Sequence, residues 1–390
     1  MTFFGGHLFY LCLVLLLIPA VILGILQKSL RLYTLAISIL FIYLIFGKDH
    51  RQLAYLFTFY VLQLILVKLY LILRKRYGRK ENIYYCTVFL SVVPLIFDKI
   101  NPLIHTNIFQ FLGVSYLTFK SVQMIIEIYD GIITEVPIVE FSAFLLHFPS
   151  LSSGPIDRSR RFHEDWVKIY SREEYLNLFA NGVFKILLGL IYKFIIAAGF
   201  YKLMGICADF KAWYYVVGYT YAYGLDLFFD FAGYSLMAVG TSYILGVRTP
   251  DNFNKPFLSL DMREFWDRWH ISLSYWFRDF IFSRFIIKCV KKKWFKNRLH
   301  RASIGFIINM LVMGMWHGLN ASYILYGLYH GCLLALTESY QKKSKFYKEN
   351  KDKKSYKFLS WFITMQLVMF GFLIFSGKFI KLLHLAKIVH

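Results

Sequence analysis

Apolar residues recur along this chain in long blocks, whereas soluble domains alternate apolar and polar positions or confine apolar residues to one helical face. Nine blocks approach the roughly 20 apolar residues that cross a bilayer as a helix, although some are short or contain Gly or Pro. The blocks are Leu8–Leu26, Leu32–Gly47, Leu53–Leu73, Ile83–Phe97, Val183–Phe200, Tyr214–Phe231, Ile304–Met315, Tyr323–Leu336 and Phe358–Ser376. This pattern predicts an all-α polytopic membrane protein, and we interpret residues 1–390 as a single membrane domain.

One segment between these blocks cannot continue a regular helix. Phe148–Phe162 reads FPSLSSGPIDRSRRF, with a Gly-Pro pair and several small residues. Backbone that is broken at membrane depth is tolerated only where it is buried in protein or lines a wet cavity. The segment therefore predicts a re-entrant loop or an interfacial turn.

A second segment, Asn252–Phe282, mixes charged residues and large aromatic residues too densely for a lipid-facing span. Helical spacing places Arg263, Asp267 and His270 close together along one face of one helix, at positions i, i+4 and i+7. The three tryptophans nearby are Trp266, Trp269 and Trp276. Spacing alone favours two interpretations equally: an interfacial helix with tryptophan anchors, or a helix that lines an internal cavity.

Composition supports the membrane interpretation, and the distribution of charge favours anionic lipids over nucleic acid as partners. The chain is 58% hydrophobic, and 45 Lys and Arg against 23 Asp and Glu give a formal charge of +22. The positive charge is concentrated in short blocks between apolar segments, as the positive-inside bias produces. These blocks are Arg74–Lys80, Arg158–Arg161, Lys288–Arg301 and Lys342–Lys357. We expect them to contact membrane lipids with anionic headgroups, and we do not expect nucleic acid as a partner.

The same charges predict the topology. No basic residue precedes the first apolar block, and Lys28 and Arg31 follow it, which favours an uncleaved first helix with an extracellular N-terminus. Continuing the alternation places Lys288–Arg301 and Lys342–Lys357 in the cytoplasm and the C-terminus outside. The five cysteines are scattered without a CxxC pair, so we predict neither a disulfide framework nor a metal site.

Several ionisable residues lie inside apolar surroundings. His317, in MGMWHG, ends an apolar block between Gly314 and Gly318. Such a residue can bond a neighbouring helix, but intramembrane ionisable groups are costly and mark functional sites. An imidazole that burial keeps neutral is suited to act as a general base. His330 we expect to be structural.

Asp226 and Asp230, spaced i, i+4, could form a carboxylate pair or a cation site. Alternatively, one of the two could pair with Arg263 or Arg268. Together with His317, both carboxylates are also candidates for a proton or ion relay, which would make the protein a transporter or a channel.

The sequence MREFWDRWHISLSYWFRDFIF, followed later by MGMWHG, resembles the membrane-bound O-acyltransferase (MBOAT) family. The pairing of a WxRWH segment with a later WHG argues against a transporter. Three further segments resemble the D-alanyl-transfer branch of that family, with the likeness densest from Gly113 to the C-terminus. They are SSGPIDR (Ser152–Arg158), LFFDFAGYS (Leu227–Ser235) and FGFLIFSGK (Phe370–Lys378).

The resemblance implies a helical bundle of about 11 or more membrane helices, with re-entrant or interfacial helices, around a transmembrane tunnel. It implies that His317 is catalytic and that His270 lies on the same tunnel, and we predict both histidines to be catalytic residues. We expect five further side chains to line the tunnel or orient the substrate: Trp269, Arg263, Asp267, Trp316 and Asp230.

The resemblance also implies an O-acyltransferase of a bacterial plasma membrane that transfers D-alanine to lipoteichoic acid hydroxyls during Gram-positive cell-wall D-alanylation. The donor would be a DltC-like carrier protein, and a DltD-like membrane protein would assist. We expect no intrinsically bound cofactor, because the carrier supplies the phosphopantetheine. An apolar and basic segment, in which we expect Ile286 and Ile287 to be exposed, suits carrier docking: Ile286, Ile287, Lys288, Lys291, Lys292 and Lys293. The alternative is another MBOAT reaction, such as acetylation of an exported polysaccharide.

Overall fold

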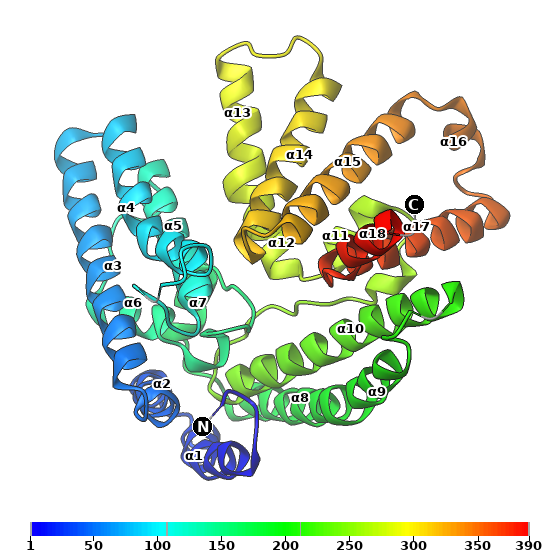
Figure 1. Ribbon diagram of the computed structural model, residues 1–390. Coiled ribbons are helices and arrows are strands. Elements are labelled where there is room, and N and C mark those ends of the chain that lie inside the picture. Colours follow the sequence, from blue (N-terminus) through cyan, green and yellow to red (C-terminus); the bar gives the residue numbers. More distant parts are fainter. Residues whose placement is uncertain (1, 107, 211, 389–390) are drawn as a thin grey trace. The chain divides into compact units, whose positions relative to one another are not determined.

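The structure, a computed structural model, describes residues 2–106, 108–210 and 212–388, with side chains described up to residue 383. In this part of the chain the regular elements are helices (Figure 1). Eight of the nine predicted apolar blocks each fall on one helix, and the ninth, Val183–Phe200, spans two consecutive helices. The helices that carry these blocks are α1 (His7–Ile25), α2 (Arg31–Phe46), α3 (His50–Tyr77), α4 (Glu81–Ile100), α8 (Arg172–Ile191), α9 (Ala198–Ile206), α10 (Trp213–Ile244), α14 (Arg298–His317), α15 (Ala321–Lys343) and α17 (Lys354–Phe375). The predicted all-α fold class is confirmed.

Six helical stretches among the described residues are long and apolar enough to cross a membrane. They are His7–Ile25, His50–Tyr77, Glu81–Ile100, Arg172–Ile206, Arg298–His317 and Lys354–Phe375. The stretch Arg172–Ile206 runs through α8, a π-helical turn at Tyr192–Ala197 and α9 without interruption. Together these stretches make the protein a multi-pass membrane protein, whereas the number of about 11 or more membrane helices stays a prediction.

The remaining helices are shorter or more polar. They are α5 (Val114–Asp130), α6 (Ile138–Leu145), α7 (Ser159–Val167), α11 (Met262–Arg268), α12 (Ile271–Phe277), α13 (Ser283–Lys291), α16 (Lys345–Asn350) and α18 (Lys378–Ile388). The chain forms two compact units, one of residues 1–191 and 233–251 and the other of residues 192–232 and 252–390. The predicted single membrane domain stays a prediction.

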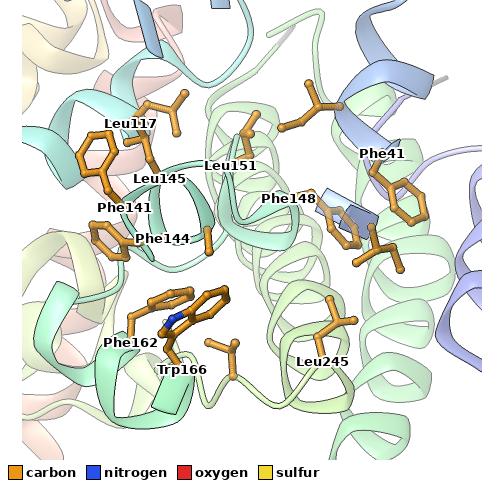
Figure 2. Close-up of a cluster of buried hydrophobic side chains, with 14 of the residues drawn as sticks. Phe41, Leu117, Phe141, Phe144, Leu145, Phe148, Leu151, Phe162, Trp166 and Leu245 are labelled. Carbon is orange, nitrogen blue, oxygen red and sulfur yellow. The ribbon is translucent and has the colours of Figure 1, made fainter. Parts of the chain in front are cut away.

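The first unit is built around a long hydrophobic cluster. Helices α3, α4 and α5 pack against one another (blue to cyan in Figure 1), and nearly all of α5 is buried. Figure 2 shows part of the cluster, where Phe144, Phe162 and Trp166 gather from α6 and α7. Phe41 of α2 stacks on Phe148 at 4.3 Å between ring centroids, so the start of the broken segment is fixed in this core.

The broken segment Phe148–Phe162 is held inside the first unit. After a 3₁₀ turn at Phe148–Ser150, the backbone is irregular as far as α7, and most of its residues are buried. The ammonium of buried Lys120 donates to the carbonyl of Phe144 and to Oγ of Ser150, at 3.1 and 2.9 Å. Because backbone polar groups without water need partners, such contacts permit irregular backbone here. The predicted break in the helix is confirmed.

The core of the second unit contains an unusually close helix pair, α14 and α15. A Cβ atom at Gly314 would lie 2.3 Å from the carbonyl oxygen of Tyr323, and one at Gly327 would lie 2.5 Å from that of Met310. Only glycine permits backbones to approach so closely. The Asn320 side chain accepts from the backbone N–H of Tyr323 at 3.0 Å and so caps α15. These contacts fix where α14 ends, at His317.

The prediction of one helix through Arg263, Asp267 and His270 is wrong. Helix α11 ends at Arg268, and a new helix, α12, begins at Ile271. His270 between them has φ of 44°, in the left-handed region that a continuous right-handed helix cannot contain. The backbone N–H of Ile271 donates to the carbonyl of Asn252 at 2.8 Å, and this bond competes with continuation of the helix.

Candidate active site

His317 is the last residue of α14, and aromatic rings surround it. The ring of Trp316 lies 4.5 Å from the imidazole between centroids, and that of Phe375 from α17 lies 5.0 Å away. Tyr323 and Tyr326 of α15 lie 5.8 and 6.4 Å away. His317 itself is half-buried. The close packing of α14 on α15 therefore places a partly accessible imidazole in apolar surroundings.

His270 lies in the same unit and is almost fully buried, with 4% of its surface exposed. Its ring makes an edge contact with Phe231 of α10 at 4.7 Å. Burial, and to a smaller extent the charge interaction with His317, lowers the pKa of His270 to about 3. The structure thus brings together the two histidines of the WxRWH and WHG motifs and keeps His270 neutral at physiological pH.

The neighbours of His270 in sequence have different surroundings. Trp269 is buried in an aromatic cluster and stacks on Phe265 at 5.5 Å. Arg263 pairs with Glu338 of α15 at 2.5 Å, and Asp267 lies 4.0 Å from Arg278. The geometry of Arg263 suits the anchoring of α11 to α15, whereas Trp269 is part of the packing around His270.

Asp226 and Asp230 lie on α10, in its part that belongs to the second unit. Asp230 pairs with Lys193 of the π-helical turn before α9. Neither Arg263 nor Arg268 is its partner, because Arg268 pairs with Glu264. The suggested arginine pairing is therefore wrong, because the lysine lies on the adjacent segment of the same unit. In the described part of the chain, Asp226 forms no ion pair.

His330 lies one helical turn beyond Tyr326 on α15 and is fully buried. Its ring is 4.5 Å from Tyr326 and 5.3 Å from Trp266, measured between centroids. A Cβ at Gly371 of α17 would come within 2.4 Å of Nε2. This close packing agrees with the structural role expected for His330.

The predicted docking segment forms α13 and the turn that follows it. Ile287 is 61% exposed, and Val290 and Trp294 are 54% and 46% exposed. Lys288 and Lys291–Lys293 are also exposed. Ile286, in contrast, is half-buried and lies 3.3 Å from where a Cβ of Gly305 on α14 would stand, so its predicted exposure is wrong. An exposed apolar and basic surface remains.

Among the described residues, no group of three or more His, Cys, Asp and Glu side chains is placed to hold a metal ion. Sequence reasoning missed Tyr323, Tyr326 and Phe375, which contact His317. The i, i+3 spacing of the two tyrosines just after MGMWHG is a signal that could have identified them. Phe375 lies 58 positions from His317, and no local pattern connects the two.

Comparison with known proteins assigns the chain to a family. The family model for MBOAT, the membrane-bound O-acyltransferase family, matches residues 38–379. The chain is similar to the teichoic acid D-alanyltransferase of Bacillus subtilis (strain 168), with 42% identity over 97% of this chain and 98% of the relative. It is similar to the teichoic acid D-alanyltransferase of Streptococcus thermophilus, with 41% identity over 96% of this chain and 94% of that protein.

A more distant similarity, at 32% identity, links 72% of this chain to 51% of a probable alginate O-acetylase, AlgI, of Pseudomonas syringae. The relatives thus include two kinds of acyl transfer, but the similarity that spans nearly the whole of both proteins is to D-alanyltransferases. The family match covers most of the chain, including α14 and both histidines. The chain therefore belongs to the membrane-bound O-acyltransferase family and is a multi-pass, membrane-bound acyltransferase.

Proposed function

We propose that this protein transfers D-alanyl groups from the phosphopantetheine thioester of a carrier protein to hydroxyl groups of lipoteichoic acid, as a DltB-type enzyme of Gram-positive cell-wall D-alanylation. The single observation that carries the proposal is the similarity at 41–42% identity, over nearly the full length of both chains, to two teichoic acid D-alanyltransferases. Two neighbouring histidines, one half-buried and one buried, suit an acyl transfer that a base assists.

In this proposal His317 is the general base. Its imidazole takes the proton of the acceptor hydroxyl while the hydroxyl oxygen attacks the thioester carbonyl, forming the C–O bond of the ester. The C–S bond then breaks, and the pantetheine thiolate leaves and takes up a proton. The aromatic rings around His317 cover part of the imidazole and limit the access of water, which favours transfer to the acceptor over hydrolysis.

His270 would then assist from the buried side of the site. Because its imidazole stays neutral, one ring nitrogen can donate a hydrogen bond to the carbonyl oxygen as negative charge develops there. Trp269 holds the turn at His270 through its packing. Among the other residues expected to line a tunnel, Trp316 contacts His317, whereas Arg263 and Asp230 act through ion pairs with Glu338 and Lys193.

The carrier would dock on α13 and the turn after it. Exposed Ile287 and Val290 beside Lys288 and Lys291 match a DltC-like partner with an acidic rim and an apolar patch. A DltD-like membrane protein would assist at the acceptor side. We further propose a bacterial plasma membrane location with both termini extracellular, because the basic blocks then lie in the cytoplasm.

Reconstitution with two acyl donors tests the substrate assignment. The protein, in liposomes with a DltD-like protein and lipoteichoic acid, receives carrier loaded with either D-alanine or acetate. We expect D-alanyl ester on the teichoic acid and little acetyl ester. Efficient acetyl transfer with no D-alanyl transfer would favour the alternative that the alginate O-acetylase similarity supports, acetylation of an exported polysaccharide.

A further inference from the structure

A partly open cavity of about 340 Å³ lies in the second unit, and its lining residues do not include His317 or His270. Its floor is the start of α11, from Leu260 to Glu264, and its walls are the end of α15, the short helix α16 and the first half of α17. Part of the lining comes from the basic segment Lys342–Lys357. This segment contains eight lysines and two acidic residues, and we predict that it faces the cytoplasm.

The charges at the cavity favour an anion. Lys351 and Lys357 are exposed at its edge, and in the part of the chain that the structure describes neither forms an ion pair. The carboxylates of the floor, in contrast, already have donors. Asp261 accepts from the backbone N–H groups of α11 and from Gln341, and Glu264 pairs with Arg268. Asp352 lies outside the lining, is exposed, and interacts electrostatically with Tyr347.

The rest of the lining is suited to the membrane boundary. Three tyrosines, Tyr340, Tyr347 and Tyr356, form an aromatic cluster with ring centroids 5.7 and 6.1 Å apart. Leu359 and Ile363 of α17 continue from this cluster along one helical face and are about half exposed, at 53% and 48%. Tyrosine marks the headgroup level of membrane proteins, and an exposed apolar helix face contacts acyl chains.

We propose that this cavity binds one anionic glycerophospholipid. Its phosphate lies between Lys351 and Lys357, its glycerol and headgroup hydroxyls contact the tyrosine cluster, and one acyl chain runs along Leu359 and Ile363. Basic pockets between membrane helices are known to hold such headgroups. The lysines alone would attract any phosphate, but the lipid-facing strip of α17 that continues from the cavity favours a phospholipid.

The lipid would stabilise the segment that leads to His270. Ser360 and Thr364 of α17 both donate to the carbonyl of Leu260, at 2.6 and 2.9 Å. Trp361 donates to the carbonyl of Phe257 at 2.8 Å. A lipid that wedges against α17 and α15 at this point therefore strengthens the anchoring of the start of α11. Lipid binding at this cavity does not depend on which acyl group the enzyme transfers, so the lipid experiment can succeed or fail independently of the proposed D-alanyl transfer.

Native mass spectrometry of the full chain, released from nanodiscs that contain phosphatidylglycerol and phosphatidylcholine, tests the proposal. We expect one retained phosphatidylglycerol, reduced about tenfold or more in Lys351→Glu/Lys357→Glu. The matched control is Lys345→Glu/Lys348→Glu, which makes the same charge change outside the cavity lining and should keep the lipid. Thr337→Trp fills the cavity without a charge change, and this variant should no longer retain phosphatidylglycerol. Unfolding temperatures measured in phosphatidylcholine show whether each variant folds.

Equal lipid loss in both lysine pairs would overturn the proposal, since it would indicate general surface attraction. Retention of the lipid in folded Thr337→Trp would also overturn it. Glycerol 3-phosphate added in detergent distinguishes a site for free phosphate. If it protects the protein against thermal unfolding as well as phosphatidylglycerol does, the cavity binds phosphate and not lipid.

Discussion

His270 adopts a backbone conformation that β-branched and most other side chains avoid. Its φ of 44° lies in the left-handed region, where asparagine is several-fold enriched and where most other residues cost about 1–2 kcal/mol. His270→Asn therefore preserves the turn between α11 and α12 and removes the imidazole. If the buried imidazole assists transfer, this variant should keep its unfolding temperature within a few degrees and lose about 10²-fold or more in acyl transfer. Wild-type transfer rates from folded His270→Asn would refute a role for this side chain.

The same residue makes a prediction about pH. The folded-state pKa of His270 is about 3, below the ordinary value of 6.5 in the unfolded chain. The unfolded state therefore binds the proton first, and stability falls as pH drops below about 6.5. This single group contributes a slope of at most about 1.4 kcal/mol per pH unit. Thermal unfolding between pH 7 and pH 5 should show a shallower decline for His270→Asn than for the wild type, and parallel curves would contradict the assignment.

At this scale the sequence placed His317 at the end of an apolar helix, where the structure has it, but misplaced the surroundings of His270. Helical spacing assumes a continuous helix, and a competing backbone bond to Asn252, 18 positions earlier, ends the helix instead. Likewise, Asp230 forms its ion pair with Lys193 and not with an arginine of the WxRWH segment. Contacts between distant segments decided both outcomes, and no local pattern contains them.

Among the elements, the pair α14 and α15 depends on glycine. A methyl group at Gly314 would stand 2.3 Å from a backbone oxygen of α15, so Gly314→Ala must separate the helices and displace His317. Overpacking of this kind costs about 1–3 kcal/mol, and we expect a lower unfolding temperature together with reduced acyl transfer. Circular dichroism melts and the transfer assay measure the two effects.

Gly205→Ala on α9 is the matched control. Nothing lies within 4 Å of the added methyl group, and alanine favours a helix by up to about 1 kcal/mol over glycine. The control should be neutral or slightly stabilising, with full transfer. Equal effects of the two substitutions would show that the close approach of α14 and α15 does not position the site.

Six of the nine hydrophobic blocks coincide with candidate membrane spans among the described residues, but no block covers α5. That helix is buried along nearly its whole length although it contains Lys120, Gln123 and Glu127. Its polar groups are satisfied by partners, as Lys120 is by Phe144 and Ser150. The polar side chains lower the mean hydropathy of α5, and mean hydropathy takes no account of their partners. A buried helix of this kind is therefore not recognised as an apolar block.

On the scale of the whole molecule, charge distribution predicts where the carrier binds. Replacing Lys291–Lys293 by glutamate reverses the charge beside exposed Ile287. We expect weaker carrier binding, by about tenfold or more at low salt, because opposite charges that steer association become like charges. Binding of labelled carrier to the protein in nanodiscs measures the effect. Lys345→Glu/Lys348→Glu carries the same kind of change elsewhere, and equal weakening there would leave Lys291–Lys293 as topology signals only.

The proposed acyl transfer depends first on His317 of α14 acting as the general base. The most direct measurement is D-alanyl transfer from loaded carrier to lipoteichoic acid by His317→Ala in liposomes. His300→Ala, at an exposed position of the same helix, serves as the control. We predict loss of about 10³-fold or more for His317→Ala and full activity for His300→Ala. Transfer by folded His317→Ala at the wild-type rate would contradict the account.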